Sequence, residues 1–398
     1  MKRRWLVFMP VLLMGVCAAT NMTKASPIFL TLIPALGFSE YTIGWMVSGF
    51  SIMSLALAFP AGWLIRKLGV RRLLLISGCA GIIGSILGAL ATDASFMLFS
   101  RFIEGTSLGI VVVVGSVAVD LIMPSKIRGL AMGIWVCFFP AGVIISMLVA
   151  PTLSNTFGWA SVWWFTTVLG LLATVLILVL YAEPKKQEEP AVQELSEAQH
   201  SQQRAFLQPD FLSIFFVCIA HFAWNFFWGA GFSSFYPTYL QDALLLSNTT
   251  AGLMVAVPNF IIIALSPLAG RLTDYLGSCK WLIAASLLEV IILLFIAFSG
   301  ILPLAWMFIL AVSLAASALP TAVFAIMPKL AKTPEATGIA MGAIVFCAHS
   351  AILIGTGIFG SLKAALGGWQ ETALFFLMPV VVVGFVFSLL IKEKRTKR

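Results

Sequence analysis

Residues 62–69 read GWLIRKLG, and residues 270–277 read GRLTDYLG. The two stretches share glycines at both ends and leucines at the third and seventh positions, and they lie 208 residues apart. Three more blocks recur at nearly the same spacing: Ser39, Gly44 and Met46 with Ser247, Gly252 and Met254; Gly129, Ala131, Met132 and Gly133 with Gly338, Ala340, Met341 and Gly342; Gly158 and Trp159 with Gly368 and Trp369. Four blocks at a steady offset indicate that the chain consists of two related halves.

Hydrophobic residues make up 61% of the 398 positions and charged residues only 10%. Soluble domains are roughly 45–50% apolar and about 25% charged. So few charges cannot cover a water-soluble fold of this size, and lipid must therefore contact most of its surface. The net charge of +8 would suit a nucleic acid, but the basic residues gather in short segments between apolar runs. We expect the lipid bilayer, and no nucleic acid, as the partner of this surface.

Twelve apolar segments approach or exceed the roughly 20 residues that a helix needs to cross a bilayer. They lie near residues 6–30, 42–64, 72–92, 97–121, 129–150, 160–181, 211–235, 250–270, 281–299, 302–325, 337–360 and 371–391. No segment shows the alternation of a transmembrane strand. We expect an all-α integral membrane protein with twelve transmembrane helices in two six-helix repeats. The predicted division is an N-terminal bundle at 1–182, a hydrophilic cytoplasmic linker at 183–209 and a C-terminal bundle at 210–398.

The N-terminus imitates a signal peptide, with basic residues 2–4 followed by an apolar run from Trp5 to Ala19. No small-x-small cleavage site follows cleanly. The apolar stretch also continues past Lys24 to Ile33, which is too long for the apolar core of a signal peptide. We interpret the segment as an uncleaved first span.

The distribution of basic residues predicts the orientation. With the N-terminus inside, nearly all of the 24 Lys and Arg residues fall in cytoplasmic segments, whereas Lys363 lies outside and Lys24 and Arg101 lie within spans. Cytoplasmic loops of membrane proteins carry such an excess of basic residues. We expect a multi-pass protein of the plasma (inner) membrane with both termini cytoplasmic.

Two motifs carry a family resemblance. Residues 270–277 match the pattern Gly-x-Leu-x-Asp-x-x-Gly, and residues 62–69 keep its glycines but have Arg66 at the aspartate position. The fourth span contains RFIEG at residues 101–105, which is similar to an Arg-x-x-Gln-Gly pattern. With six plus six spans, the whole chain resembles the major facilitator superfamily. The resemblance implies a secondary active transporter, not an enzyme, whose halves rock about a central site by alternating access.

The resemblance also implies that these loops latch the cytoplasmic ends of the two halves. Glycines permit the tight turns, and the aspartate pairs with basic residues when the gate is closed. In the first half Asp120 would supply the acid for Arg66 or Arg71; the alternative is that these are ordinary solvated charges. The predicted gate consists of Gly62, Arg66, Gly69, Arg71, Asp120, Gly270, Asp274 and Gly277.

Lys24 and Arg101 are costly residues inside a membrane. At 1.5 Å per residue, they lie at comparable depth in the outer half of the bilayer. The resemblance implies that their spans, the first and fourth, both line the central cavity. We therefore predict an anion site in which Arg101 offers a bidentate fork to a carboxylate and Asn21 adds a hydrogen bond. The alternative is that Lys24 extends to the outer surface and Arg101 only pairs with Glu104.

Glu104 follows Arg101 by three residues, so the two share one face of a helix. An anion that bound Arg101 and Lys24 would leave Glu104 buried without a partner, which favours its protonation. We predict that Glu104 carries a coupled proton. Glu289, near the middle of the ninth span, is a second proton-coupling candidate or else a neutral buried acid.

The seventh span is rich in aromatic residues around His221, and His349 lies near midplane in the eleventh span. We predict that His221, Trp224, Asn225 and His349 line the substrate site, which would suit a planar or apolar-bodied substrate. The alternatives are that the histidines are packing residues and that the aromatic rings form a lipid-facing or packing surface.

Six cysteines are scattered singly along the chain, without the paired spacing of a disulfide framework or a zinc site. No nucleophile stands with a partnered base at a motif spacing. We expect no metal, no cofactor and no enzymatic activity.

The predicted function is proton-coupled uptake of a small organic anion, a carboxylate, by a monomer. In this the sequence resembles the organic-anion and cyanate-type branches of the superfamily. The alternative is a proton-driven exporter of drugs or amphipathic metabolites, which the aromatic seventh span favours. The fifth span disfavours it, because residues 139–142 read FPAG and lack the glycine that precedes the proline in drug/proton antiporters.

Overall fold

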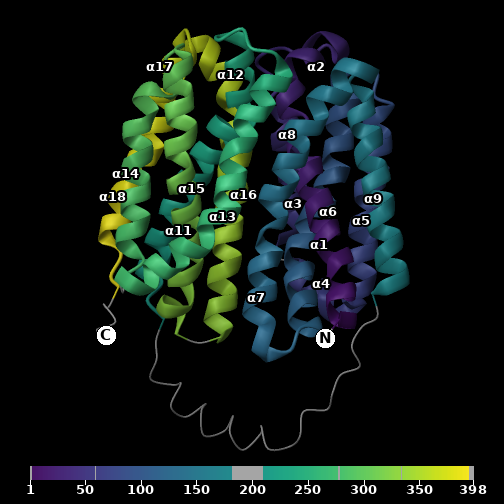
Figure 1. Ribbon diagram of the computed structural model, residues 1–398, viewed down its shortest axis with the longest axis vertical. Coiled ribbons are helices and arrows are strands. Elements are labelled where there is room, and N and C mark those ends of the chain that lie inside the picture. The colour runs from purple at the N-terminus through teal and green to yellow at the C-terminus, as the bar shows by residue number, and fades with distance from the viewer. Residues whose placement is uncertain (1, 59, 182–208, 277, 333, 394–398) are drawn as a thin grey trace, which may run out of the picture.

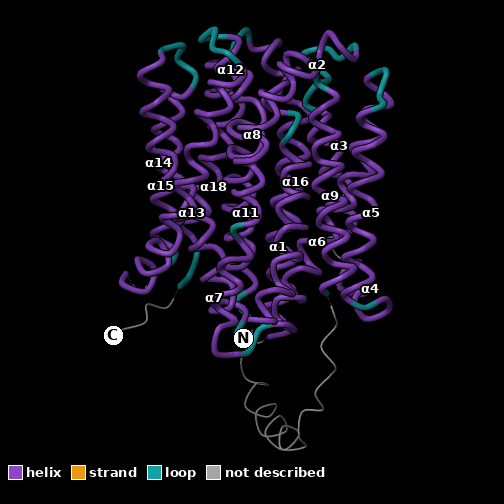
Figure 2. The backbone as a smooth tube through the Cα atoms, turned by 45° about the vertical axis from the view of Figure 1, so that its right-hand side comes forward, coloured by secondary structure: helices purple, strands orange, loops and turns teal. Residues whose placement is uncertain are grey.

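The computed structural model describes most of the chain as helices joined by short connections. The described residues are 2–58, 60–181, 209–276, 278–332 and 334–393. No strand occurs within these ranges, as Figure 2 shows. The predicted linker at 183–209 lies outside the described residues except for its last position, so the predicted division into domains stays a prediction.

The two halves of the chain lie side by side (Figure 1). The helices of the first half are α1 (Lys2–Thr23), η1 (Ser26–Ile28), α2 (Phe29–Leu36), α3 (Trp45–Ala58), α4 (Pro60–Leu68), α5 (Val70–Ala89), α6 (Ala94–Ile122), α7 (Ser125–Val136), α8 (Phe138–Phe157) and α9 (Ala160–Leu180). Those of the second half are α11 (Phe211–Asn225), η2 (Phe226–Phe235), α12 (Tyr236–Asp242), α13 (Asn248–Leu276), α14 (Lys280–Ala297), α15 (Leu302–Ala331), α16 (Pro334–Leu366), α17 (Trp369–Thr372), η3 (Ala373–Leu377) and α18 (Met378–Leu390).

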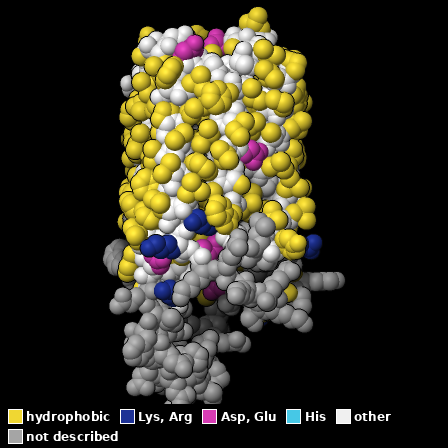
Figure 3. Space-filling model, turned by 90° about the vertical axis from the view of Figure 1, so that its left-hand side faces the viewer, with side chains coloured by type: hydrophobic (Ala, Val, Ile, Leu, Met, Phe, Trp, Pro, Cys, Tyr) yellow, Lys and Arg dark blue, Asp and Glu magenta, His cyan; other side chains and the backbone are white. Residues whose placement is uncertain are grey.

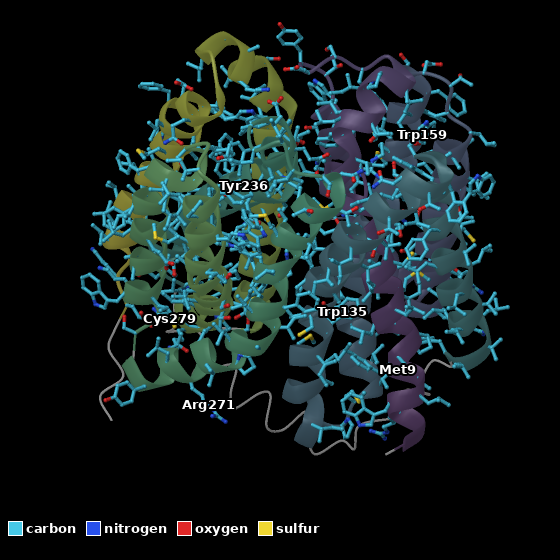
Figure 4. The ribbon with its side chains drawn as sticks, turned by 45° about the horizontal axis from the view of Figure 1, so that its top comes forward. Met9, Trp135, Trp159, Tyr236, Arg271 and Cys279 are labelled. Atoms are coloured by element: carbon cyan, nitrogen blue, oxygen red, sulfur yellow. The ribbon has the colours of Figure 1, made fainter. Side chains whose placement is uncertain are left out.

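Helix α1 begins and α18 ends at the same end of the bundle, which we call the terminal end. The opposite end, with α2, α12 and α17, is the far end. Figure 4 places Arg271 toward the terminal end and Trp159 toward the far end. Hydrophobic side chains cover the middle of the face in Figure 3, and Lys and Arg side chains gather toward its lower, terminal end. This distribution fits a surface whose middle is embedded in lipid.

Within the described ranges, eleven helical stretches are long and apolar enough to cross a membrane, and they correspond to eleven of the predicted spans. The second predicted span, 42–64, contains α3 and α4, which lie on either side of residue 59, a position outside the described residues. The apolar stretch described in α3 is Trp45–Leu57.

Two aspartates fix where the fourth and seventh spans begin. Asp93 accepts a hydrogen bond from the Phe96 N–H at 3.0 Å, and Asp210 accepts one from the Ser213 N–H at 3.0 Å. A side-chain oxygen at this position satisfies an N–H that has no partner inside the helix. These N–H donors lower the pKa of both carboxyl groups below its usual range.

The first and seventh spans both depart from α-helix. In the first, α1 ends at Thr23 and the chain resumes through η1, where Pro27 removes a donor and crowds the preceding turn. In the seventh, the whole of η2 is a π-helix. Shifted by the 208-residue offset, η2 corresponds to residues 18–27. Interrupted helices at corresponding positions of two repeats indicate where a transporter binds its substrate.

Two glycines allow the halves to touch at the far end. A Cβ at Gly44, directly before α3, would overlap the Thr356 carbonyl oxygen of α16, and a Cβ at Gly252 of α13 would overlap the Met147 carbonyl oxygen of α8. Gly44 and Gly252 are 208 residues apart, and Met147 and Thr356 are 209 apart. The duplicated halves therefore make the same glycine-to-carbonyl contact twice. We call these two crossings the far-end contacts.

Hydrogen bonds flank both far-end contacts. Beside Gly44, the Ser48 and Thr356 hydroxyls lie 2.7 Å apart. Beside Gly252, the side-chain amides of Asn155 and Asn248 donate to each other at 2.8 Å. Both sets join one half of the chain to the other.

Candidate functional site

Glu104 lies between two cations in the interior of the first half. Its Oε1 is 2.7 Å from the Lys24 ammonium, and its Oε2 accepts a hydrogen bond from the Arg101 guanidinium. All three side chains are 0% exposed. The structure confirms that Lys24 and Arg101 lie at comparable depth and that Arg101 pairs with Glu104. Lys24 does not extend to the outer surface, because Glu104 and the bundle interior enclose it. We call these three residues the charge triad.

Glycines on neighbouring helices make room for the triad. A Cβ at Gly84 of α5 would overlap the Glu104 side chain, and a Cβ at Gly105 of α6 would overlap the Phe50 carbonyl oxygen of α3. Helix α6 therefore packs directly against both neighbours, which places Arg101 and Glu104 inside the bundle rather than on its surface.

The Lys24 ammonium is surrounded by side-chain acceptors. Besides Glu104 it reaches Asn21 Oδ1 at 2.7 Å, Thr166 Oγ1 at 2.7 Å and Ser85 Oγ at 3.2 Å. These are four acceptors for an ammonium with three N–H donors. The sequence gives no sign of the roles of Ser85 and Thr166, because serine and threonine are ordinary residues in membrane spans and nothing marks these two.

Arg101 binds the main chain as well as Glu104. Its Nη1 donates to the Asn21 carbonyl at 2.7 Å, its Nη2 to the Met22 carbonyl at 2.9 Å and its Nε to the Met46 carbonyl at 2.9 Å. The Phe50 ring lies against the guanidinium, 4.8 Å from its central carbon. The guanidinium thus joins α6 to the end of α1 and the start of α3.

Asn21 belongs to the same network. Its Oδ1 accepts from Lys24 and lies 3.0 Å from the Ser85 hydroxyl, whose single proton is directed either to Asn21 or to Glu104. Its buried Nδ2 has no hydrogen-bond partner among the described residues. Asn21 therefore orients Lys24 and retains an unused donor beside it.

The triad carries a net charge of +1, because two cations share one carboxylate. Isolated buried charge is costly. The excess positive charge therefore favours the binding of one further anion, or the replacement of Glu104 by another anionic partner. Chemically, the carboxylate can take up a proton, and the cations can bind an anionic group. None of the described residues forms a cluster of the kind that holds a metal ion.

Three of the residues predicted to line the substrate site, His221, Trp224 and Asn225, lie together on α11. The Asn225 amide lies 3.1 Å from His221 Nε2 and donates to the His221 carbonyl at 2.8 Å. Trp224 is 3% exposed and stacks on Trp228 at 5.3 Å. These tryptophans face the protein interior and not the lipid, which contradicts the lipid-facing alternative for them. Their binding of a substrate remains a prediction.

His349 lies on α16, which packs against α11, and Glu289 lies on α14. The His349 Nδ1 is buried and has no hydrogen-bond partner among the described residues. Glu289 is half-buried on α14, in a different half of the molecule from the triad. No interaction recorded for the described residues joins either of them to the triad, and a proton-carrying role for Glu289 remains a prediction.

The predicted gate is described only in part. Gly69 turns the chain from α4 into α5 with a φ of 79°, a left-handed conformation that favours glycine. Arg71 donates to the Leu178 carbonyl at 2.7 Å, and Asp120 is exposed near the end of α6. Gly270 has room around it, with the Thr321 methyl 3.9 Å from a Cβ position. The surroundings of Gly62, Arg66 and Asp274, and all of Gly277, lie outside what the structure describes, so the latch stays a prediction.

The family follows from a comparison with known protein families. The model of the Major Facilitator Superfamily matches residues 11–244 and 217–398. The chain belongs to the Major Facilitator Superfamily. Its two overlapping matches cover both repeats, and members of this superfamily are membrane transporters and not enzymes.

Among curated relatives of this facilitator is the "Probable anion transporter 6, chloroplastic" of Arabidopsis thaliana. It is 29% identical over 278 residues, which are 64% of this chain and 52% of that protein. The chain therefore aligns with about half the length of this relative.

Two solved structures share the facilitator's fold. The crystal structure of a D-xylose-proton symporter has a TM-score of 0.75 at 15% identity, covering 97% of both chains. A bacterial homolog of the human lysosomal transporter Spinster, in an inward-facing and unoccupied conformation, has a TM-score of 0.77 at 14% identity, covering 99% of both chains. At these identities the likeness shows the fold alone, and it confirms the predicted two-bundle architecture.

Proposed function

We propose that this facilitator uses a proton gradient to take up a small organic anion with one carboxylate group. The observation that carries the proposal is the buried charge triad, in which two cations share a single carboxylate. The Glu104 carboxylate has the chemistry expected of the transported group. It is hydrogen-bonded to an ammonium, a guanidinium and a hydroxyl.

The charges of the triad suggest how proton and anion are coupled. When Glu104 takes up a proton it becomes neutral and no longer balances Lys24 and Arg101. A substrate carboxylate that replaces it restores the net charge of +1, so one proton and one monoanion enter together. By thermodynamic reciprocity, protonation strengthens anion binding by the same factor as anion binding strengthens protonation.

One relative bears the name of an anion transporter and another that of a methyl viologen resistance protein, so the names of the relatives do not choose between the two substrates. The drug-export alternative rests on the aromatic seventh span. There, Trp224, Trp228 and Phe232 stack on one another, with centroids 5.3 and 4.6 Å apart. Rings whose faces are already occupied by one another are better explained as packing than as a drug-binding wall.

The direction of transport depends on the orientation of the protein. We propose that it lies in the plasma (inner) membrane with the terminal end facing the cytoplasm. In a cysteine-free protein, an impermeant thiol reagent should label Leu245→Cys from outside intact cells and should not label Tyr275→Cys. Leu245 is 87% exposed near the far end, and Tyr275 is 70% exposed near the terminal end of α13. Permeabilised cells should label both. Labelling of Tyr275→Cys alone in intact cells would reverse the orientation.

Uptake of labelled monocarboxylates into proteoliposomes tests the function. With an inward proton gradient, we expect accumulation from a panel of glycolate, lactate and phenylacetate, and none of the corresponding amides. Lys24→Met should abolish it, because methionine fills similar space without a charge. Lys280→Met is the matched control, since Lys280 lies at the start of α14, outside the triad, and it should transport normally.

Two results would contradict the proposal. One is equal uptake of the carboxylates and their amides, which would remove the need for an anion. The other is normal accumulation by Lys24→Met protein, which would place the anion elsewhere.

A further inference from the structure

The break in the first span leaves two main-chain carbonyls without their usual donors. In an unbroken helix the Asn21 and Met22 carbonyls would accept the N–H groups of residues 25 and 26. Among the described residues, neither carbonyl receives a main-chain N–H. Both lie deep in the bundle, where an unsatisfied carbonyl is costly.

The Arg101 guanidinium supplies the missing donors. It donates to Asn21 and Met22 through its two terminal nitrogens and to the Met46 carbonyl of α3 through Nε. With Glu104, four of its five N–H groups are in use. Only the planar fork of arginine can reach all of these acceptors at once. A cation at this point also suits the partial negative charge at the end of α1.

Lys24 has partners of a different kind. All four of its acceptors are side chains, three of them neutral: Asn21, Ser85 and Thr166. Hydroxyl groups can rotate and donate their own protons instead. If Glu104 loses its charge, Lys24 gives up its only ionic partner, and no main-chain group is left unsatisfied when the ammonium moves.

We infer that the two cations have separate roles: Arg101 is a positioning residue that holds the broken first span, and Lys24 is the cation that exchanges Glu104 for the transported anion. The second role rests on the proposed function, whereas the first does not. Arg101 thereby keeps the break in one geometry through both charge states of Glu104. The transported group is recognised by a single ammonium, which suits one carboxylate rather than two.

Distances between spin labels test the positioning role without any substrate. In a cysteine-free protein, labels at Thr31→Cys on α2 and Ser95→Cys on α6 report how the segment after the break sits against the bundle. Both positions are exposed near the far end. We expect a narrow distance distribution in the parent protein and a distribution at least twice as broad in Arg101→Gln. Lys24→Met should leave it narrow.

The conservative variant separates positioning from charge. Arg101→Lys keeps a cation beside Glu104 but cannot reach three carbonyls. We therefore expect it to broaden the distribution as much as Arg101→Gln does. If Arg101→Lys restores the narrow distribution, or if Lys24→Met broadens it equally, the division of roles is wrong.

Pro27→Ala should restore the order of the first span that Arg101→Gln removes. Pro27→Ala restores an N–H and removes the ring that breaks the helix, so residues 25 and 26 can again donate to Asn21 and Met22. The double variant Pro27→Ala/Arg101→Gln should show a narrower distribution and a higher thermal midpoint than Arg101→Gln alone. A double variant no narrower than the single one would overturn the inference. Because no substrate is present, this result is independent of whether the carboxylate uptake assay succeeds.

Discussion

Glu104→Gln should abolish proton-driven accumulation while leaving exchange of substrate across the membrane. Glutamine has the size of glutamate and resembles its protonated form, but it cannot release a proton. The substrate carboxylate would then meet the Lys24 ammonium without competition from Glu104 at any pH. We expect the accumulation ratio under a proton gradient to fall to one, and the pH dependence of binding to disappear. Counterflow of labelled against unlabelled lactate, or whichever panel member is transported, measures the exchange that remains.

The same substitution should also destabilise the protein. Removing one partner of a buried ion pair leaves uncompensated charge and typically costs about 3–5 kcal/mol. Adding Lys24→Met to Glu104→Gln removes one of the two cations that have lost their carboxylate partner. Glu104→Gln/Lys24→Met should therefore be more stable than Glu104→Gln alone, as measured by thermal unfolding in detergent, and this non-additivity identifies the pair.

The outcome that contradicts this coupling mechanism is specific. If Glu104→Gln still concentrates substrate with unchanged pH dependence, the proton does not bind at Glu104. Glu289 and His349 would then be the next residues to change.

Gly44→Val and Gly252→Val should each prevent closure at the far end. A valine at either position would collide with the opposing carbonyl oxygen, Thr356 or Met147, and neither backbone can move without separating the helices. Overpacking of this kind costs about 1–3 kcal/mol, which lowers the closed population roughly 5- to 150-fold. We expect turnover to fall accordingly, and the double variant to be inactive.

Spin labels across the far end measure the shift directly. The labels are placed at Phe157→Cys and Leu245→Cys. Phe157, on α8, is 73% exposed, Leu245 is 87% exposed, and the two residues lie in different halves. Their distance should increase in either valine variant. Gly133→Val is the matched control, because a Cβ there meets no atom within 4 Å. An unchanged distance in both valine variants would mean that the glycines do not limit closure.

The depth of the charged residues could be predicted from the sequence because the helix rise is fixed. Counting residues from the ends of two spans placed Lys24 beside Arg101, and the structure brings both onto Glu104. The three-residue spacing of Arg101 and Glu104 was enough to predict their pairing. The steady 208-residue offset was enough to predict two repeats, since matched glycines retain matched positions.

The remaining contacts depend on three-dimensional packing that no local pattern contains. Pro27 is visible in the sequence, but which side chain would serve the carbonyls freed by the break depends on how α6 crosses α1. Serine and threonine in spans usually bond their own preceding turn, so Ser85 and Thr166 gave no sign of reaching Lys24. The π-helical form of η2 likewise follows from tertiary packing, because its ten residues read as an ordinary apolar helix.

The far-end contacts have a consequence for how such a chain arose. Gly44 of the first repeat meets a carbonyl of the second, and Gly252 makes the reverse contact at the matched position. This is the form of an isologous interface, in which the same patch on two identical subunits is self-complementary. By this symmetry, two identical six-span subunits that carried this glycine and this carbonyl would make the same pair of contacts with each other. Fusion of two such subunits would place both contacts within one chain.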